Sequence, residues 1–163
     1  KQEANYIEKD ERVTTFFARD TQSPSTGESA WKSCLNTLKN LTGPIHLTID
    51  IDGLDGSLVP ATGTPVPGGL SFWQATEVIE AVFSAPNSTV ISVDVNEIVA
   101  QEDTPLTQFT AAMVATKAIA MHLKARKEGR WQAVAKQAGR IRMPQISDYF
   151  RQQKSSESRE ETA

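Results

Sequence analysis

Hydrophobic and polar residues alternate most regularly between Ile45 and Asp52. Isoleucine or leucine occupies every second position, and the positions between them hold His46, Thr48, Asp50 and Asp52. A period of two residues is typical of a β-strand that has one buried face and one polar face. The pattern therefore predicts a strand that runs through Asp52 and carries both aspartates on its polar face.

The remaining pattern predicts helices and strands in alternation. Segments 13–18 and 89–95 are rich in β-branched residues, which favours strands, and the second is apolar on both faces. Apolar residues at helical spacing predict helices over 28–41, over 71–85 and over 105–124, and a polar helix precedes them over 1–10. Strands that alternate with helices are typical of a parallel α/β sheet.

Two of these helices allow sharper predictions. Ser71 and Gln74 have the spacing of a capping box, so we expect a helix to begin directly after Ser71. On the last helix, we expect the buried stripe to consist of Leu106, Phe109, Met113 and either Ile119 or Ala120.

Length and composition fit one folded domain. The chain has 163 residues, and its 17 Lys and Arg against 20 Asp and Glu give a net charge of −3, which does not indicate a nucleic-acid partner. No apolar run reaches the roughly 20 residues of a membrane-spanning helix, so no membrane partner is expected. The single cysteine, Cys34, excludes an internal disulfide framework and fits a cytoplasmic location. We assign residues 1–127 to the α/β domain, 128–151 to a helical extension and 152–163 to a disordered tail.

The two aspartates at the end of the Ile45 strand form a candidate metal site. On a regular strand the Cα atoms of Asp50 and Asp52 would be about 6–7 Å apart, and like charges that close repel each other unless a cation lies between them. Carboxylate oxygens suit Mg²⁺, Ca²⁺ or Mn²⁺. The following residues, 60–69, include three prolines and three glycines, which predicts a rigid loop at the strand's carboxyl end. Open α/β sheets place their binding crevices at this end.

A further carboxylate, Glu97, follows the predicted strand over 89–95. Neighbouring parallel strands end side by side, so we expect Glu97 to face Asp50 and Asp52 across one crevice. A carboxylate can bind a planar guanidinium through two parallel hydrogen bonds, which makes a guanidino compound its natural ligand.

Two neighbouring polar residues are assigned structural roles. We expect Asp55 to accept hydrogen bonds from backbone N–H groups of its turn instead of binding metal. His46 shares a strand face with Asp50 but lies deeper in the sheet, so we expect it to be packed or hydrogen-bonded.

The run from Ile49 to Ser71, IDIDGLDGSLVPATGTPVPGGLS, resembles the C-terminal signature of the ureohydrolase family, which includes arginases and agmatinases. The shared features are a strand ending in Asp-x-Asp-x-x-Asp, a Thr-Gly-Thr-Pro loop and a Gly-Gly-Leu that opens a helix. Asp94-Val95-Asn96-Glu97 resembles a second family motif. The sequence departs from the family at Gly56, where proline is usual, and we expect a changed turn there.

The resemblance implies a three-layer α/β fold, with a parallel sheet and helices on both faces, of which this chain holds the C-terminal part. It also implies a manganese-dependent amidinohydrolase with two Mn²⁺ ions in the complete enzyme. Asp50 would bridge both ions and Asp52 would bind one. Glu97 would orient the guanidinium of the substrate, with Thr64 beside it, for attack by a metal-bound hydroxide that releases urea. Agmatine is the first candidate substrate, arginine or a guanidino acid is the alternative, and a homo-oligomer is usual in the family.

The upstream family motifs, Gly-Gly-Asp-His and Asp-Ala-His-x-Asp, do not occur in this sequence, nor does the expected proton-shuttle histidine. We expect them to precede Lys1 in the complete protein, and we expect the 163-residue chain alone to bind manganese weakly and to lack hydrolase activity. Two alternatives remain. In the first, the chain is a non-catalytic fragment or pseudo-enzyme subunit. In the second, it is a haloacid-dehalogenase-like phosphatase. Such phosphatases also end a strand in Asp-x-Asp-Gly, but they have threonine directly after the glycine, where this sequence has Leu54.

Overall fold

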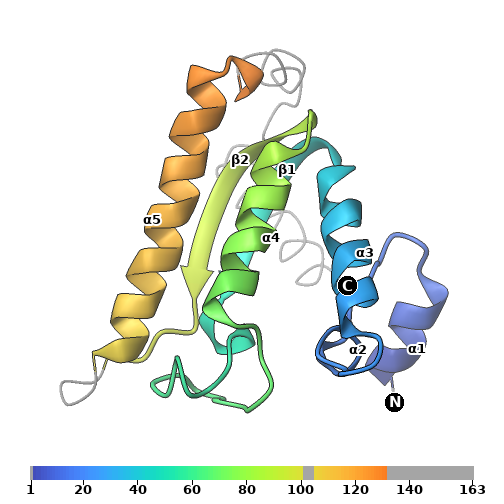
Figure 1. Cartoon of the computed structure of the whole chain (residues 1–163), viewed down its shortest axis with the longest axis vertical. Helices are drawn as coiled ribbons and strands as arrows, with labels where there is room; N and C mark the ends of the chain where they lie inside the picture. Colours follow the sequence, from blue (N-terminus) through green and yellow to red (C-terminus); the bar gives the residue numbers. More distant parts are fainter. Residues whose placement is uncertain (1, 101–104, 132–163) are drawn as a thin grey trace, which may run out of the picture.

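The computed structural model describes residues 2–100 and 105–131 (Figure 1). Its elements are α1 (Gln2–Lys9), α2 (Ala18–Thr21), α3 (Gly27–Lys39), β1 (Thr42–Asp50), the short 3-10 helix η1 (Ile51–Gly53), α4 (Phe72–Ser84), β2 (Asn87–Asn96) and α5 (Leu106–Lys127). The predictions for the tail from residue 132 onward lie outside the described residues, and the domain boundaries stay predictions.

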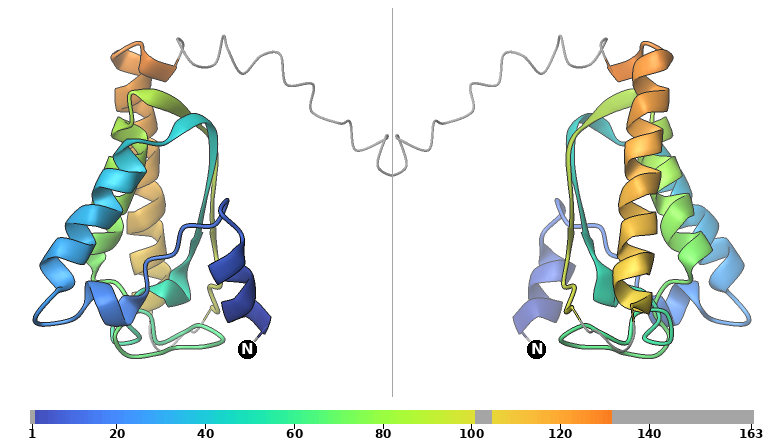
Figure 2. Two further views of the ribbon diagram at one scale, coloured as in Figure 1. Left: turned by 90° about the vertical axis from the view of Figure 1, so that its right-hand side faces the viewer. Right: turned by 90° about the vertical axis from the view of Figure 1, so that its left-hand side faces the viewer.

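The strands β1 and β2 form a parallel two-stranded sheet, in which Leu47 lies opposite Val93 and Asp50 lies opposite Asn96. Helix α4 connects the two strands, and α3, α4 and α5 all lie on one face of the sheet (Figure 2). The predicted arginase-like α/β fold with a parallel sheet is confirmed, and the chain forms part of such a domain. Of the described helices, α1 lies on the other side of the sheet, and none packs across that face as a layer.

The hydrophobic core lies between the sheet and these three helices. It joins side chains from the segment after β1, from α4 and from α5, of which the most deeply buried are Ile51, Leu54, Val59, Ile79 and Val114. The capping box at the start of α4 is confirmed: the Gln74 backbone N–H donates to the Ser71 hydroxyl at 3.2 Å, and the Ser71 N–H donates to Gln74 Oε1 at 3.0 Å. Helix α4 therefore begins where the sequence predicts, directly after the loop of residues 60–69.

The register of the sheet contains one irregularity. Ile45 pairs with Val90, whereas the next residue, His46, pairs with Ser92, so Ile91 is an extra residue on β2. An extra residue of this kind is a β-bulge. Because paired residues point to the same face, the bulge leaves Val90 on the helix-covered face with Ile45 and brings Ser92 to the opposite face with His46.

The end of β1 differs from the prediction. The strand stops at Asp50, and Ile51–Gly53 form η1, closed by a hydrogen bond from the Leu54 N–H to the Ile51 carbonyl at 3.1 Å. The prediction that Asp52 lies on the strand is therefore wrong, and the two-residue alternation does not relate it to Asp50. The physical reason is burial: Ile51 and Leu54 are almost completely inaccessible, and the tight turn lets both side chains reach the core.

The strand predicted over 13–18 does not form. Residues 13–17 have no regular structure, and α2 begins at Ala18. A β-strand requires a partner for its backbone N–H and C=O groups, and the sheet of the described residues consists of β1 and β2 alone. The β-branched and aromatic composition of this segment is thus not sufficient for a strand.

The predicted buried stripe of α5 is also wrong. Phe109 is 67% exposed and Ile119 61% exposed, and Leu106, Met113 and Ala120 are exposed as well. The buried face instead consists mainly of small residues, namely Thr107, Thr110, Ala111, Val114, Ala118, Met121 and Ala125. Small side chains allow α5 to approach its neighbours closely, and this helix has two apolar faces that periodicity alone cannot tell apart. None of the described helices combines the length and apolar character that crossing a membrane requires.

Candidate functional site

The carboxyl ends of β1 and β2 lie side by side, as predicted. Asp50 ends β1 opposite Asn96, which ends β2, and Glu97 follows directly. Glu97 has a φ of 62°, and it is the one non-glycine residue with positive φ among the described residues. This left-handed conformation is unfavourable for a glutamate, and strained backbone of this kind gathers at functional sites. The sheet therefore brings Asp50 and Glu97 to one end of the molecule.

The two aspartates have different surroundings. The carboxylate of Asp50 is exposed and has no hydrogen-bond partner within residues 2–100 and 105–131. Asp52 is half-buried in η1, and its Oδ2 accepts a hydrogen bond from the Thr64 hydroxyl at 2.5 Å. Thr64 thus contacts Asp52, and its predicted role in orienting Glu97 stays a prediction.

The rigid loop also passes beside Glu97. A β-carbon placed on Gly63 would lie 4.0 Å from Glu97 Oε2. The Val99 N–H donates to the Ala61 carbonyl at 3.0 Å, which ties the segment after Glu97 to the loop. One loop therefore contacts the segment of Asp52 on one side and the segment of Glu97 on the other.

Asp55 holds the two ends of this loop together. Its Oδ1 accepts from the Ser57 hydroxyl at 2.5 Å and from the Ser57 N–H at 3.0 Å, and its Oδ2 accepts from the Gly68 N–H at 2.8 Å. These bonds, led by the one from the Ser57 hydroxyl, lower the pKa of the Asp55 carboxyl. The predicted structural role of Asp55 is confirmed.

Gly69 closes the loop by direct backbone contact. A β-carbon at this position would lie 2.4 Å from the carbonyl carbon of Leu54, closer than packed atoms allow. Leu70 bridges to Leu54, and its N–H donates to the Gly53 carbonyl at 2.9 Å. The close approach explains the glycine at position 69, and the positive φ of 82° explains the glycine at position 68.

Two threonines of α5 form hydrogen bonds with the backbone between η1 and α4, and the sequence analysis did not predict these contacts. The hydroxyl of Thr107, which is fully buried, accepts a hydrogen bond from the Ala61 N–H at 2.8 Å. The Thr110 hydroxyl donates to the Leu58 carbonyl at 3.4 Å. Threonines spaced by three residues on an otherwise apolar helix are a signal for such contacts, because buried hydroxyls require partners.

The donor set fits part of a site for a divalent cation. Within the part of the chain that the structure describes, the Asp50 carboxylate has no hydrogen-bond partner, and Asp52 accepts one bond, from Thr64 to its Oδ2. Such hard oxygen donors suit Mn²⁺ as well as Mg²⁺ or Ca²⁺. The described residues contain no group of three or more His, Cys, Asp or Glu side chains that could hold a metal ion. Asp50 and Asp52 would therefore require further ligands from elsewhere.

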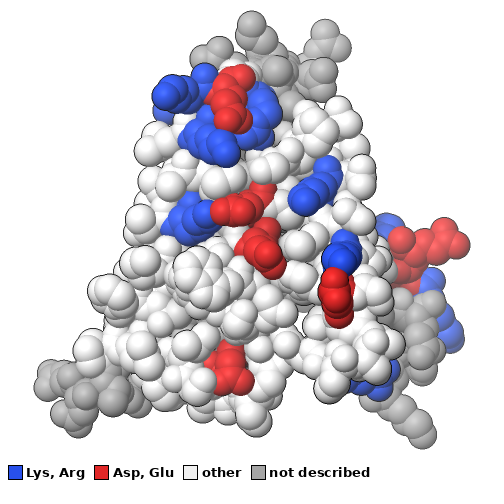
Figure 3. Space-filling view, in the orientation of Figure 1, with Lys and Arg blue, Asp and Glu red and all other residues white. Residues whose placement is uncertain are grey.

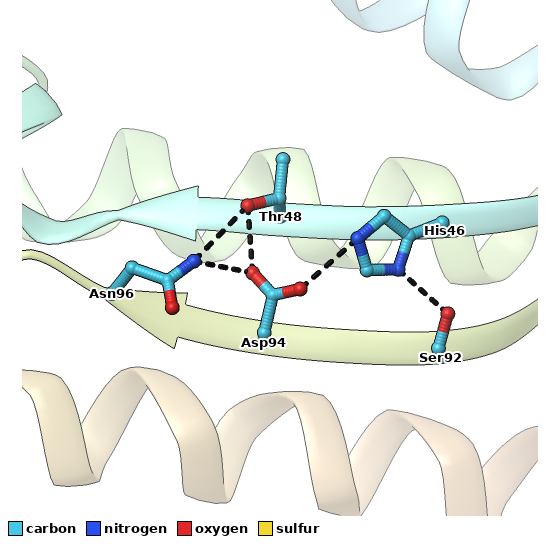
Figure 4. Close-up of polar contacts among 5 residues, drawn as sticks. All are labelled: His46, Thr48, Ser92, Asp94 and Asn96. Atoms are coloured by element: carbon cyan, nitrogen blue, oxygen red, sulfur yellow. Dashed lines mark hydrogen bonds and ion pairs between the residues drawn. The ribbon is translucent and has the colours of Figure 1, made fainter. Parts of the chain in front are cut away.

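Polar side chains also line the face of the sheet that the helices leave uncovered (Figure 4). His46 Nδ1 lies 2.6 Å from the Ser92 hydroxyl, and His46 Nε2 lies 3.0 Å from Asp94 Oδ2. The prediction of a hydrogen-bonded histidine is thus confirmed. Hydrogen bonds lower the pKa of the Asp94 carboxyl, and the largest contribution comes from the Thr48 hydroxyl.

The outer face of the helical layer has a different character. It carries charges of both signs, and several of them are paired, for example Lys117 with Glu80 and Lys32 with Glu28 (Figure 3). Such mixed and paired charges do not form a concentrated field of one sign. Asp50 and Glu97, at the end of the sheet, have no such cationic partner within residues 2–100 and 105–131.

Comparison with known proteins agrees with this geometry. Residues 1–121 match the sequence model of the Arginase family. The chain belongs to the arginase family. Over 98 residues this arginase-family chain is 34% identical to the N(1)-aminopropylagmatine ureohydrolase of Thermococcus kodakarensis, and the match covers 59% of the chain and 33% of that protein. Over 78 residues it is 37% identical to Arginase-1 of Oryctolagus cuniculus, which covers 48% of the chain and 24% of that protein.

Solved structures of arginase-family proteins resemble the fold. A hypothetical agmatinase from Burkholderia thailandensis aligns with a TM-score of 0.52 at 33% identity, over 63% of this chain and 32% of that one. The agmatine ureohydrolase of Thermoplasma volcanium aligns with a TM-score of 0.61 at 22% identity, over 76% of this chain and 40% of that one. The chain thus spans 24–33% of the two sequence relatives and 32–40% of these two structures. Membership of this family excludes the alternative of a haloacid-dehalogenase-like phosphatase.

Proposed function

We propose that the complete protein is a manganese-dependent amidinohydrolase that cleaves a guanidino compound into an amine and urea. The observation that carries this proposal is the pairing of Asp50 with Asn96, which brings an aspartate with no hydrogen-bond partner among the described residues to the same sheet end as Glu97. Family membership supports hydrolysis of a guanidino compound as the reaction class. Arginase-family relatives include proteins named for the hydrolysis of arginine and of agmatine derivatives.

In this proposal Asp50 and Asp52 supply carboxylate ligands to manganese. The metal, when bound, lowers the pKa of its coordinated water and so supplies a nucleophile near neutral pH. Thr64 donates a hydrogen bond to Oδ2 of Asp52 and so restrains the orientation of this carboxylate. A carboxylate that is already held by a hydrogen bond needs little rearrangement when the metal binds.

Glu97 is proposed to bind the guanidinium of the substrate. Its carboxylate has no hydrogen-bond partner in the part of the chain that the structure describes, and the left-handed backbone directs it away from the strand's regular alternation. Two parallel bonds from the guanidinium would orient its central carbon toward the metal side of the crevice. The role of Thr64 beside Glu97 belongs to the same proposal.

Agmatine is the first candidate substrate. Two of the relatives, one by sequence and one by structure, are named for agmatine or an agmatine derivative, and arginine or a guanidino acid is the alternative. Cytoplasmic location, a place in polyamine metabolism and assembly into a homo-oligomer complete the proposal.

The test is a urea-release assay with manganese, run on agmatine, arginine and guanidinobutyrate. The protein from the complete reading frame is expected to release urea from one of them, and the 163-residue chain is expected to release none and to bind manganese weakly. Failure of the complete protein on all three substrates would refute the proposed activity. Turnover by the 163-residue chain would refute its dependence on upstream ligands.

A second candidate is a non-catalytic subunit that assembles with partners. It is favoured by the lack of a group of three or more metal-binding side chains among residues 2–100 and 105–131. The two candidates differ in the upstream coding sequence, where an active enzyme requires the two histidine motifs. Their presence would favour the hydrolase, and their absence would favour the subunit.

A further inference from the structure

Five polar side chains connect β1 and β2 on the face that the helices leave uncovered. They are His46 and Thr48 of β1 and Ser92, Asp94 and Asn96 of β2, and we refer to them as the polar ladder (Figure 4). The β-bulge at Ile91 is what aligns the two halves, because it sets Ser92 opposite His46, Asp94 opposite Thr48 and Asn96 opposite Asp50.

Asp94 is the centre of the polar ladder. Its Oδ1 accepts from the Thr48 hydroxyl at 2.6 Å and from the Asn96 amide at 2.6 Å, and its Oδ2 lies 3.0 Å from His46 Nε2. The Asn96 amide also lies 3.3 Å from the Thr48 hydroxyl, which closes a triangle of three side chains. Bonds to an ionised carboxylate are shorter and stronger than bonds between neutral groups.

This triangle of side chains lies at the last paired residues of the two strands, next to the candidate site. Thr48 is two residues before Asp50 on the same face of β1, and Asn96 is opposite Asp50 and adjacent to Glu97. Strand ends tend to fray, and the backbone conformation of Glu97 ends the regular pairing at this point. Cross-strand side-chain bonds at the last paired positions counteract that fraying.

We propose that Thr48 and Asp94 are positioning residues, which hold the end of β1 against the end of β2 and so set the spacing between Asp50 and Glu97. This inference rests on the proposed function, in which the metal ligands follow β1 and the guanidinium-binding carboxylate follows β2. Reacting groups on two separate strands keep their geometry only if the strands do, and a displacement of 1 Å costs roughly 100-fold in rate.

The decisive variant is Thr48→Val in the complete protein, because valine keeps the β-branched shape and only replaces the hydroxyl with a methyl group. The expected result is a loss of at least about tenfold in kcat/KM for the active guanidino substrate. Manganese bound per chain is expected to stay at the wild-type level, because Asp50 and Asp52 both belong to β1 and the turn that follows it. Thr48→Ser, which restores the hydroxyl, is expected to restore kcat/KM.

A matched control separates positioning from general destabilisation. Thr116→Val replaces a hydroxyl that bonds the Ala112 carbonyl at 2.7 Å on the surface of α5, a helix on the other face of the sheet from the polar ladder, and it is expected to leave all parameters unchanged. A purely structural role for Thr48 predicts that activity falls only in proportion to the folded fraction, measured by circular dichroism, and to manganese content. That result would overturn the inference.

The outcomes distinguish this inference from the function on which it rests. An inactive wild-type protein overturns the proposed function and the positioning role together. An active wild type with unchanged kcat/KM in Thr48→Val overturns the positioning role alone. Loss of kcat/KM with normal manganese content and rescue by serine supports both.

Discussion

The two faces of the β1–β2 sheet differ in composition, one apolar and one polar, and in the role that we assign to each. On the covered face, Leu47 and Ile49 pack against the core formed with the helices. On the uncovered face, the polar ladder ends in Asn96, which lies opposite Asp50 and directly before Glu97. Alternation along a strand makes this division possible, because substitutions on one face leave the other face largely undisturbed. The comparison teaches that the covered face determines whether the chain folds, whereas the uncovered face and its loops determine what it can bind.

The largest expected effect falls on the uncovered face. Asp50→Ala in the complete protein removes a proposed metal ligand, so under the proposed function urea release should fall by more than about 100-fold, the upper end for residues that merely support a ligand. Asp55→Ala should retain manganese and mainly lower stability, because Asp55 bonds Ser57 and Gly68 of its own loop. Equal catalytic loss with intact manganese content in both variants would contradict the assigned roles.

In the core that packs on the covered face, truncation to alanine should lower stability and leave the chemistry of the site unchanged. Ile79 is 1% exposed, and Ile79→Ala should lower the free energy of unfolding by about 2–5 kcal/mol, measured by denaturant titration. Ile119→Ala is the matched control, because Ile119 is 61% exposed and its truncation should cost less than about 0.5 kcal/mol. A large cost at Ile119 would mean that another surface covers α5 in the complete protein.

The loop of residues 60–69 is expected to be sensitive to substitution at Gly69. A β-carbon there would press on the backbone of Leu54, so Gly69→Ala should destabilise the protein by about 1–3 kcal/mol. Gly53→Ala offers a comparison in the same region, since a β-carbon at Gly53 meets no atom within 4 Å. Similar unfolding midpoints for the two variants would show that the Gly69 contact is not tight in solution.

The smallest expected effect is a pH dependence at Asp55. Because hydrogen bonds lower the pKa of the folded-state carboxyl, its ionised form stabilises the fold above the unfolded pKa of about 3.9. That stabilisation is lost as the pH falls through the lower, folded-state pKa. Asp55→Asn should therefore be less stable than the wild type at pH 6, and the difference in thermal midpoint should shrink as the pH falls below about 4. A difference that is constant from pH 6 to pH 3 would exclude this linkage.

Much of the candidate site was predictable because it depends on local patterns and on one rule of topology. The spacing of Ser71 and Gln74 predicted the start of α4, and the rule that neighbouring parallel strands end together predicted that Asp50 and Glu97 share one end of the sheet. The structural role of Asp55 followed from its turn, because its partners, Ser57 and Gly68, belong to the same loop.

The errors have a common origin in contacts between distant segments. Asp52 left the strand because Ile51 reached the core, and α5 turned a face of small residues inward because those residues fit against its neighbours. The bulge at Ile91, which aligns Asp94 with Thr48, leaves only one mark in the sequence, the two consecutive apolar residues Val90 and Ile91, and a strand buried on both faces would show the same pattern. Each of these outcomes depends on which surfaces meet, and a one-dimensional pattern does not contain that information.

The amino-acid sequence by itself determined the family, the parallel α/β class and the residues with which the site is built. Only the tertiary structure decided which partners those residues have: Thr64 with Asp52, Gly63 beside Glu97, and Asp94 with Thr48. The reason is that motif chemistry resides in residue types and short spacings, whereas hydrogen-bond partners are set by how closely packed segments approach one another.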